Sequence, residues 1–257
     1  MGTLLGHAVP GTLFILFAIW WSVNIWKRYL ISRRENLEYK NSLTFPCGCC
    51  CQGLKTFQVE GILKVVASTV GIIGELVTGF KDGQMELGNW HHVTMYAGML
   101  VSGLVDILLH HQKLLPEGTD YITFGLAVLV EGVLFYFHIH DRDDLDIQLH
   151  SILICIIGFG VVTLAVEYTT PQSHLGGFAR SYAFLLQGIW FWVVGLILYA
   201  PTIAPWATIV DNNETELIMK TALILGWMMI GSLIIIFIIG AIINCQLRLT
   251  IDKYTVM

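Results

Sequence analysis

Long apolar stretches alternate with short polar segments along the chain, and this pattern predicts seven membrane-spanning helices. None of the stretches shows the strict period-two alternation of a transmembrane strand, and a helix satisfies its backbone hydrogen bonds internally. A hydrocarbon core about 30 Å thick needs roughly 20 apolar residues per helix. The predicted spans are residues 10–26, 57–79, 90–110, 121–140, 146–168, 179–200 and 217–244. We therefore expect an all-α polytopic membrane protein, a seven-transmembrane-helix bundle that forms a single domain over residues 1–257.

The distribution of basic residues predicts the orientation of this bundle. Lysine and arginine concentrate in cytoplasmic loops. The segment before the first span has none, whereas the segment after it contains Lys27, Arg28, Arg33, Arg34, Lys40 and Lys55. This places the N-terminus on the non-cytoplasmic side and, after seven crossings, the C-terminus in the cytoplasm.

Composition supports a membrane protein and excludes other classes. The chain is 55% hydrophobic and 13% charged, whereas charged residues make up about a quarter of a typical soluble domain. The lipid bilayer is therefore the expected partner. No basic run interleaved with aromatic residues suggests a nucleic-acid partner.

Two features of the predicted loops are candidates for covalent modification. Cys47, Cys49, Cys50 and Cys51 cluster in the first cytoplasmic loop, where lipidation by palmitoylation competes with a reduced, unmodified cluster, and a zinc knuckle is the weaker alternative. The sequon at Asn213 lies in the last non-cytoplasmic loop, where it could accept glycosylation or be a chance match.

Ionisable residues at membrane depth point to chemistry, since each costs on the order of 2.5 to 3.5 kcal/mol to insert. At 1.5 Å per residue, one group falls in the non-cytoplasmic third of the bundle. Its members are His92, His138, His150, Asp146 and Glu75. Imidazole and carboxylate ligands suit Zn²⁺ or a similar transition metal, so this group is a candidate metal site, with zinc as a candidate cofactor. A buried hydrogen-bond network without an ion is the equal alternative.

A second group of polar residues lies at the midplane or towards the cytoplasm and is a candidate proton or polar network. It consists of Asp106, Glu131, Glu60, Lys64, Glu167 and Gln187. Glu60 and Lys64 are four residues apart and are expected to form an ion pair. Asp106 and Glu131 have no basic residue adjacent in sequence, so they are expected either to be protonated or to pair with residues of other helices, and they are the better proton-relay candidates.

Several motifs make the sequence resemble the transmembrane protein 45 family. They are Gly6–Gly11, Asn89–Tyr96, Ser102–Asp106, Glu131–His140, Leu145–Asp146, His150–Ser151 and Leu186–Trp192. The resemblance implies a seven-helix protein of Golgi, endosomal or lysosomal membranes, with the plasma membrane as an alternative. It admits a homodimer and implies no established activity. It adds His7 and His140 to the candidate polar positions, while His91, the cysteine cluster and the short C-terminal tail depart from the family pattern.

Two functions follow from these residues. The first is a non-enzymatic membrane protein whose inward cluster binds a metal ion or protons. The alternative is an intramembrane zinc-dependent lipid hydrolase, in which such ligands would activate water. A seven-helix receptor fits the helix count but not the motifs, because the third span ends in Asp106–His110 without an Asp-Arg-Tyr box.

Overall fold

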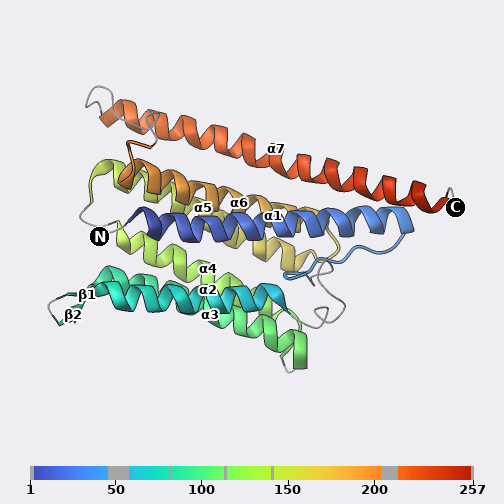
Figure 1. Ribbon diagram of the computed structural model, residues 1–257, viewed down its shortest axis with the longest axis horizontal. Helices are drawn as coiled ribbons and strands as arrows, with labels where there is room; N and C mark the ends of the chain where they lie inside the picture. The colour runs from blue at the N-terminus through green and yellow to red at the C-terminus, as the bar shows by residue number, and fades with distance from the viewer. Residues whose placement is uncertain are drawn as a thin grey trace. The chain divides into compact units, whose positions relative to one another are not determined.

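A computed structural model of the chain confirms the all-helical, seven-span architecture (Figure 1). It describes residues 3–45, 58–81, 83–112, 115–139, 142–203 and 214–255. Within these ranges, seven helices are long and apolar enough to cross a membrane. The helices are α1 (Leu4–Glu35), α2 (Val59–Gly79), α3 (Leu87–Gln112), α4 (Thr119–His138), α5 (Asp144–Thr169), α6 (His174–Tyr199) and α7 (Glu214–Thr255).

The first and last helices extend well beyond the predicted spans. Helix α1 starts at Leu4, where the Thr3 hydroxyl accepts a 3.0 Å hydrogen bond from the Gly6 amide, and continues to Glu35. The basic residues predicted to lie in the first loop therefore lie on this helix up to Arg34. Arginine and lysine are good helix formers and stabilise a helix C-terminus, so the backbone stays helical after the apolar stretch ends. Hydropathy therefore predicts the length of the membrane span, and the helix itself can extend beyond that span.

A short β-hairpin joins α2 to α3 where the sequence predicted only a loop. Strands β1 (Phe80–Lys81) and β2 (Gln84–Met85) pair antiparallel, and Gly83 adopts a positive φ of 79° in the turn. The Lys81 ammonium donates to the Glu86 carboxylate at 2.6 Å. This hydrogen bond lowers the pKa of the exposed Glu86 carboxyl. The hairpin fixes how the C-terminus of α2 meets the N-terminus of α3.

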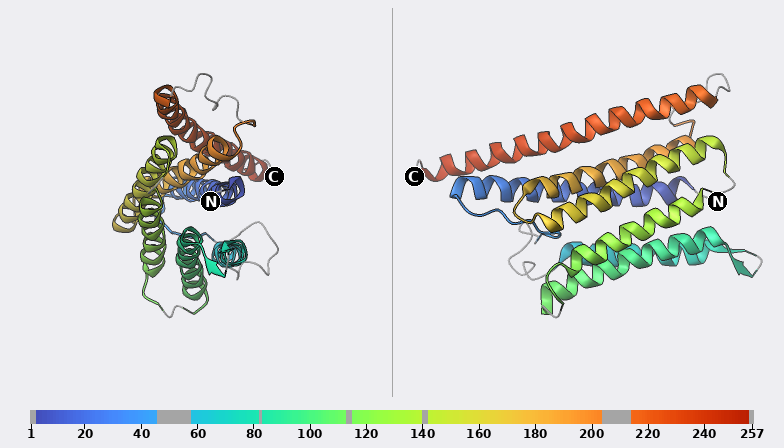
Figure 2. Two further views of the ribbon diagram at one scale, coloured as in Figure 1. Left: turned by 90° about the vertical axis from the view of Figure 1, so that its left-hand side faces the viewer. Right: turned by 180° about the vertical axis from the view of Figure 1, so that it is seen from behind.

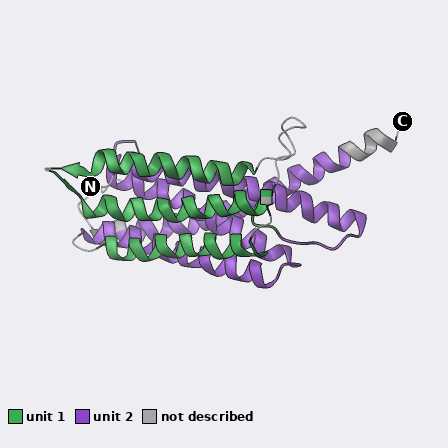
Figure 3. Cartoon of the chain, turned by 90° about the horizontal axis from the view of Figure 1, so that it is seen from below, with its two compact units in different colours: residues 1, 42–140 green, residues 2–41, 141–257 purple. Residues whose placement is uncertain are grey.

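The chain divides into two compact units (Figure 3). Unit 1 comprises residues 42–140 and contains α2, β1, β2, α3 and α4. Unit 2 comprises residues 2–41 and 141–257 and contains α1, α5, α6 and α7. The polar residues of each unit are therefore described separately.

In unit 1, α3 packs between α2 and α4, and a pair of glycines sets the crossing of α2 with α3. A Cβ on Gly61 would lie 2.9 Å from the Gly103 carbonyl oxygen, and one on Gly103 would lie 2.8 Å from the Gly61 carbonyl oxygen. Only residues without a side chain allow this approach, which also brings the polar residues of the two helices within contact distance.

In unit 2, α6 is the central helix and packs against α1, α5 and α7, as the two views of Figure 2 also show. A Cβ on Gly188 of α6 would lie 2.6 Å from the carbonyl oxygen of Gly11 on α1, so this crossing also depends on glycine. Helix α7 is attached to α1 through the Trp26 indole, which donates to the Ile236 carbonyl at 3.0 Å. Most of α7 stays exposed in the protein, as expected for a helix that faces lipid.

The segment after α1 folds back onto the α5–α6 connection. The Asn41 backbone amide donates to the Pro171 carbonyl at 2.7 Å, and the Asn41 side-chain amide donates to the Ser173 carbonyl at 2.6 Å. The buried Tyr39 hydroxyl donates to Asn41 Oδ1 at 2.7 Å. Burial, reinforced by the negative charge of Glu167, raises the pKa of Tyr39 to about 12.

Candidate functional site

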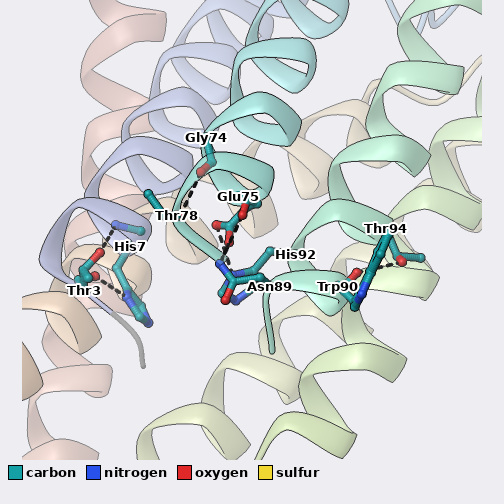
Figure 4. Close-up of polar contacts among 10 residues, drawn as sticks. Thr3, His7, Gly74, Glu75, Thr78, Asn89, Trp90, His92 and Thr94 are labelled. Atoms are coloured by element: carbon teal, nitrogen blue, oxygen red, sulfur yellow. Dashed lines mark hydrogen bonds and ion pairs between the residues drawn. The ribbon is translucent and has the colours of Figure 1, made fainter. Parts of the chain in front are cut away.

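Glu75 organises a polar cluster at the end of unit 1 that carries the hairpin. Its carboxylate accepts a 2.6 Å hydrogen bond from the Asn89 side-chain amide, and its second oxygen lies 3.1 Å from Nδ1 of His92 (Figure 4). Asn89 and His92 are three residues apart on α3 and so lie on the same face of that helix, toward α2. The side chains of His92 and Glu75 are 29% and 18% exposed, so both are accessible from outside the protein.

His138 joins this cluster from α4, which ends at that residue. Its ring centroid lies 5.4 Å from that of His92 and 5.8 Å from that of His91. Imidazoles from two helices and a carboxylate from a third thus meet at one end of the unit. We call Glu75, Asn89, His91, His92 and His138 the histidine cluster.

The five candidate metal ligands fall in two different units. Glu75, His92 and His138 lie together in unit 1, whereas Asp146 and His150 lie in unit 2. Within the described ranges, no three His, Cys, Asp or Glu side chains form a group that could hold a metal ion. A shared metal site for all five residues is therefore still only a prediction.

A buried ion pair lies deeper in unit 1 and differs from the one predicted. Nζ of Lys64 lies 2.8 Å from Oδ2 of Asp106 and 3.4 Å from the Ser102 hydroxyl. Lys64 therefore pairs with Asp106 on α3, and the expected partner, Glu60, instead accepts a 2.6 Å hydrogen bond from the Phe45 amide. The reason is tertiary, because the Gly61 and Gly103 crossing places the carboxylate of α3 beside the lysine.

Phe124 of α4 completes the surroundings of this pair. The Lys64 ammonium lies 4.2 Å from the centroid of the Phe124 ring, within the range of a cation–π interaction. The side chains of Lys64 and Asp106 are 5% and 0% exposed. At such burial, the pair compensates two charges that would each be costly alone.

Glu131 lies on α4 and is 5% exposed. The Tyr96 ring of α3 lies within electrostatic reach of both Glu131 and Glu75, and a Cβ on Gly71 of α2 would meet it at 2.7 Å. Tyr96 and Glu131 therefore occupy the region between the histidine cluster and the buried ion pair.

Unit 2 contains a separate carboxylate and imidazole pair near the start of α5. Asp146 Oδ1 lies 2.6 Å from Nδ1 of His150, and its Oδ2 accepts from Arg142 at 2.6 Å. The Asp146 and His150 pairing follows the four-residue spacing in the sequence. His150 is 1% exposed, and its ring meets that of His7 edge-on at 5.8 Å between centroids. Sequence reasoning included His7 only through the family resemblance and missed Arg142.

Helices α5 and α6 of unit 2 also share a buried ion pair. Glu167 accepts from Nε of Arg180 at 2.6 Å, and both side chains are fully buried. The Arg180 guanidinium lies 4.3 Å from the centroid of the Trp21 ring. Gln187 is also fully buried on α6. The charge signs alone could have suggested Arg180 as the partner of Glu167, because they lie on consecutive spans at similar predicted depth.

The modification candidates lie outside the described residues. Cys47, Cys49, Cys50, Cys51 and Asn213 all fall in the ranges 46–57 and 204–213, so their lipidation and glycosylation are still predictions.

Comparison with known proteins gives a family match over the second half of the chain. The model described as "Family of unknown function (DUF716)" matches residues 117–241, which include α4, α5 and α6. The matched family carries no assigned function.

Two curated relatives extend the similarity beyond that region. Transmembrane epididymal protein 1 of Rattus norvegicus is 23% identical over 256 residues, covering 93% of this chain and 81% of the rat protein. Transmembrane epididymal protein 1 of Homo sapiens is 24% identical over 206 residues, covering 74% of this chain and 73% of the human protein. The chain is therefore a multi-pass membrane protein similar to these proteins along most of its length.

Proposed function

We propose that this membrane protein binds and releases protons at the histidine cluster, in a non-enzymatic role that responds to the pH of the adjoining compartment. The observation that carries the proposal is the 3.1 Å contact between His92 Nδ1 and Glu75 Oε1, formed by two partly exposed side chains. Histidine is the side chain whose unperturbed charge change falls between pH 5 and 8. A carboxylate beside it stabilises the imidazolium form.

Protons fit this cluster better than a metal ion does. A structural or catalytic zinc needs three or four donor atoms directed at one point. Both oxygens of Glu75 already face side-chain nitrogens, those of Asn89 and His92, so the carboxylate is oriented as a hydrogen-bond acceptor. The absence of a metal-binding group among the described residues supports the same choice.

The membership of the transmembrane protein 45 family and the location that it implies are part of this proposal. Golgi, endosomal and lysosomal lumens are acidic, and the orientation predicted from the basic residues directs the histidine cluster toward such a lumen. A histidine that binds a proton there would then change its charge as the protein moves between compartments.

Nuclear magnetic resonance of histidine-labelled protein in detergent tests the proposal. We expect the ring nitrogens of His92 and His138 to bind and release protons reversibly in metal-free protein when the pH of the sample is changed. Glu75→Gln keeps the shape of the side chain and removes its charge, so it should alter the titration of His92. Exposed His110, near the other end of α3, is the matched control and should titrate as in the wild type.

Elemental analysis of the same sample separates the alternatives. About one zinc per chain, with ring resonances that do not respond to pH, would contradict proton binding and favour the zinc-dependent lipid hydrolase. Rings that stay neutral in metal-free protein over the whole pH range would also overturn the proposal.

A further inference from the structure

Each helix of unit 1 carries a stripe of polar side chains along its inner face. On α2 the spacing is four, four and seven residues, which keeps the side chains on one side of the helix. The stripes of the three helices together form what we call the polar column. Its members are Glu60, Lys64, Ser68 and Glu75 on α2, His92, Tyr96, Ser102 and Asp106 on α3, and Asp120, Glu131 and His138 on α4.

The column reaches from one end of the unit to the other. Between His92 and Asp106 lie fourteen residue steps of α3, or about 21 Å at the helical rise, which is most of the hydrocarbon thickness. The histidine cluster forms its hairpin end, and Glu60 lies in the first turn of α2 at its opposite end. Tyr96 and Glu131 fill the interval in which α2 contributes no ionisable group.

Asp106 is a buried carboxylate of the column and has charged neighbours from both adjacent helices. Lys64 of α2 contacts it at 2.8 Å, and Asp120 of α4 lies within electrostatic reach of both. Its own helix contributes Ser102, whose hydroxyl lies 3.4 Å from the Lys64 ammonium. Within the described part of the chain, the second carboxylate oxygen of Asp106 accepts no hydrogen bond, which leaves an acceptor position open inside the membrane.

We infer that unit 1 conducts protons across the membrane along the polar column, between the histidine cluster and the Lys64 and Asp106 pair. This inference rests on the proposed function for its hairpin-side entrance. Protons would enter at Glu75 and His92, pass through the region of Tyr96 and Glu131, reach the open oxygen of Asp106 and leave through Glu60 at the opposite end of the column. Each transfer moves one proton from an oxygen or nitrogen to the next acceptor, so no oxidant or co-reactant is needed and one positive charge crosses the membrane.

The number of ionisable groups in unit 1 favours proton conduction over a purely structural role in holding the helices together. One buried ion pair is enough to tie two helices together, as Glu167 and Arg180 do in unit 2. Unit 1 has its own buried pair and in addition buries Glu60 and Glu131 to 2% and 5% exposure. Intramembrane acidic residues that continue from one end of a bundle to the other are typical of proton relays.

Proton uptake into vesicles tests the inference. The full-length protein is reconstituted into vesicles loaded with a pH-sensitive dye, and a potassium ionophore compensates the charge. After an external acid pulse, the lumen of wild-type vesicles should acidify faster than that of protein-free vesicles. Glu131→Gln keeps the volume and the hydrogen-bonding side chain but removes the titration, and should abolish the added rate.

A double variant separates conduction from stability. Lys64→Met combined with Asp106→Leu replaces the buried pair by apolar groups, which a fold generally tolerates better than losing one partner. It should stay monodisperse and lose the added proton flux. Glu167→Gln is the matched control, because it removes one charge of an equally buried pair in unit 2, and it should keep the wild-type flux per folded molecule.

The outcomes separate this inference from the proposed function. Wild-type flux equal to that of protein-free vesicles would overturn conduction, while the ring resonances could still establish proton binding. Equal loss of flux in Glu131→Gln and Glu167→Gln would also overturn it, since a general effect on packing would then explain both. Flux that is lost only in the column variants would support it.

Discussion

Lys64 of α2 and Asp106 of α3 lie 42 residues apart in sequence and form a 2.8 Å ion pair inside unit 1. The contact exists because two glycines one turn away allow their helices to approach. A single geometric feature thus satisfies two charges that neither helix could accommodate alone.

The coupling of this pair is directly measurable. Lys64→Met should lower the free energy of unfolding by about 3–5 kcal/mol, because it leaves a buried carboxylate without its counter-charge. The double variant with Asp106→Leu should recover most of that loss. Unfolding of purified protein in mixed detergent gives both values, and additive losses from the two single substitutions would contradict the pairing.

The helix crossing in unit 1 should be sensitive to one methyl group. Gly61→Ala places a Cβ 2.9 Å from the Gly103 carbonyl oxygen, so the helices must separate, at a cost of about 1–3 kcal/mol. Gly74→Ala on the same helix is the matched control, because nothing lies within 4 Å of its Cβ position. We expect the control to be neutral or slightly stabilising in the same unfolding measurement. Equal effects of the two substitutions would rule out the close crossing.

Asp146 should contribute more to the stability of the fold than its acidic neighbours at the start of α5. It accepts from Arg142 and lies against His150, whereas the neighbouring Asp143 and Asp144 are exposed. Asp146→Ala should therefore cost about 1–3 kcal/mol, since it removes the carboxylate that accepts from Arg142 and lies against the buried His150. Asp144→Ala should change the melting temperature little. If both variants melt alike, the pair contributes nothing to stability.

The segment after α1 should give the protein a characteristic response to alkaline pH. The pKa of Tyr39 is raised from 10.0 to about 12, so folding favours the neutral phenol. The stabilisation that this provides is complete below pH 10 and is lost as the pH rises through about 12. Tyr39→Phe should therefore flatten the fall of the unfolding free energy across this window. An identical slope in the wild type and in Tyr39→Phe would contradict the assignment.

Local patterns in the sequence were enough to predict some of this protein. Long apolar runs specified seven helices, because an unpaired backbone in lipid is too costly for any other structure. The four-residue spacing of Asp146 and His150 places both on one face of a helix, and the two side chains are in contact in the structure. The ends of the helices were harder to predict from the sequence. Hydropathy indicates which residues lie in the membrane, but it says little about where the helical backbone stops.

Only the tertiary structure decided which polar groups meet. The four-residue spacing predicted Glu60 as the ion-pair partner of Lys64. In the structure, the crossing of α2 with α3 places Asp106 beside the lysine, and these two residues form the pair. Assignment by depth grouped His92 with His150; the two residues belong to different compact units, and a joint site for them stays a prediction. Depth and spacing constrain one helix at a time, and the choice of partner depends on which faces of different helices come together. That choice rests on side-chain volume at the crossings, where glycine sets the distance.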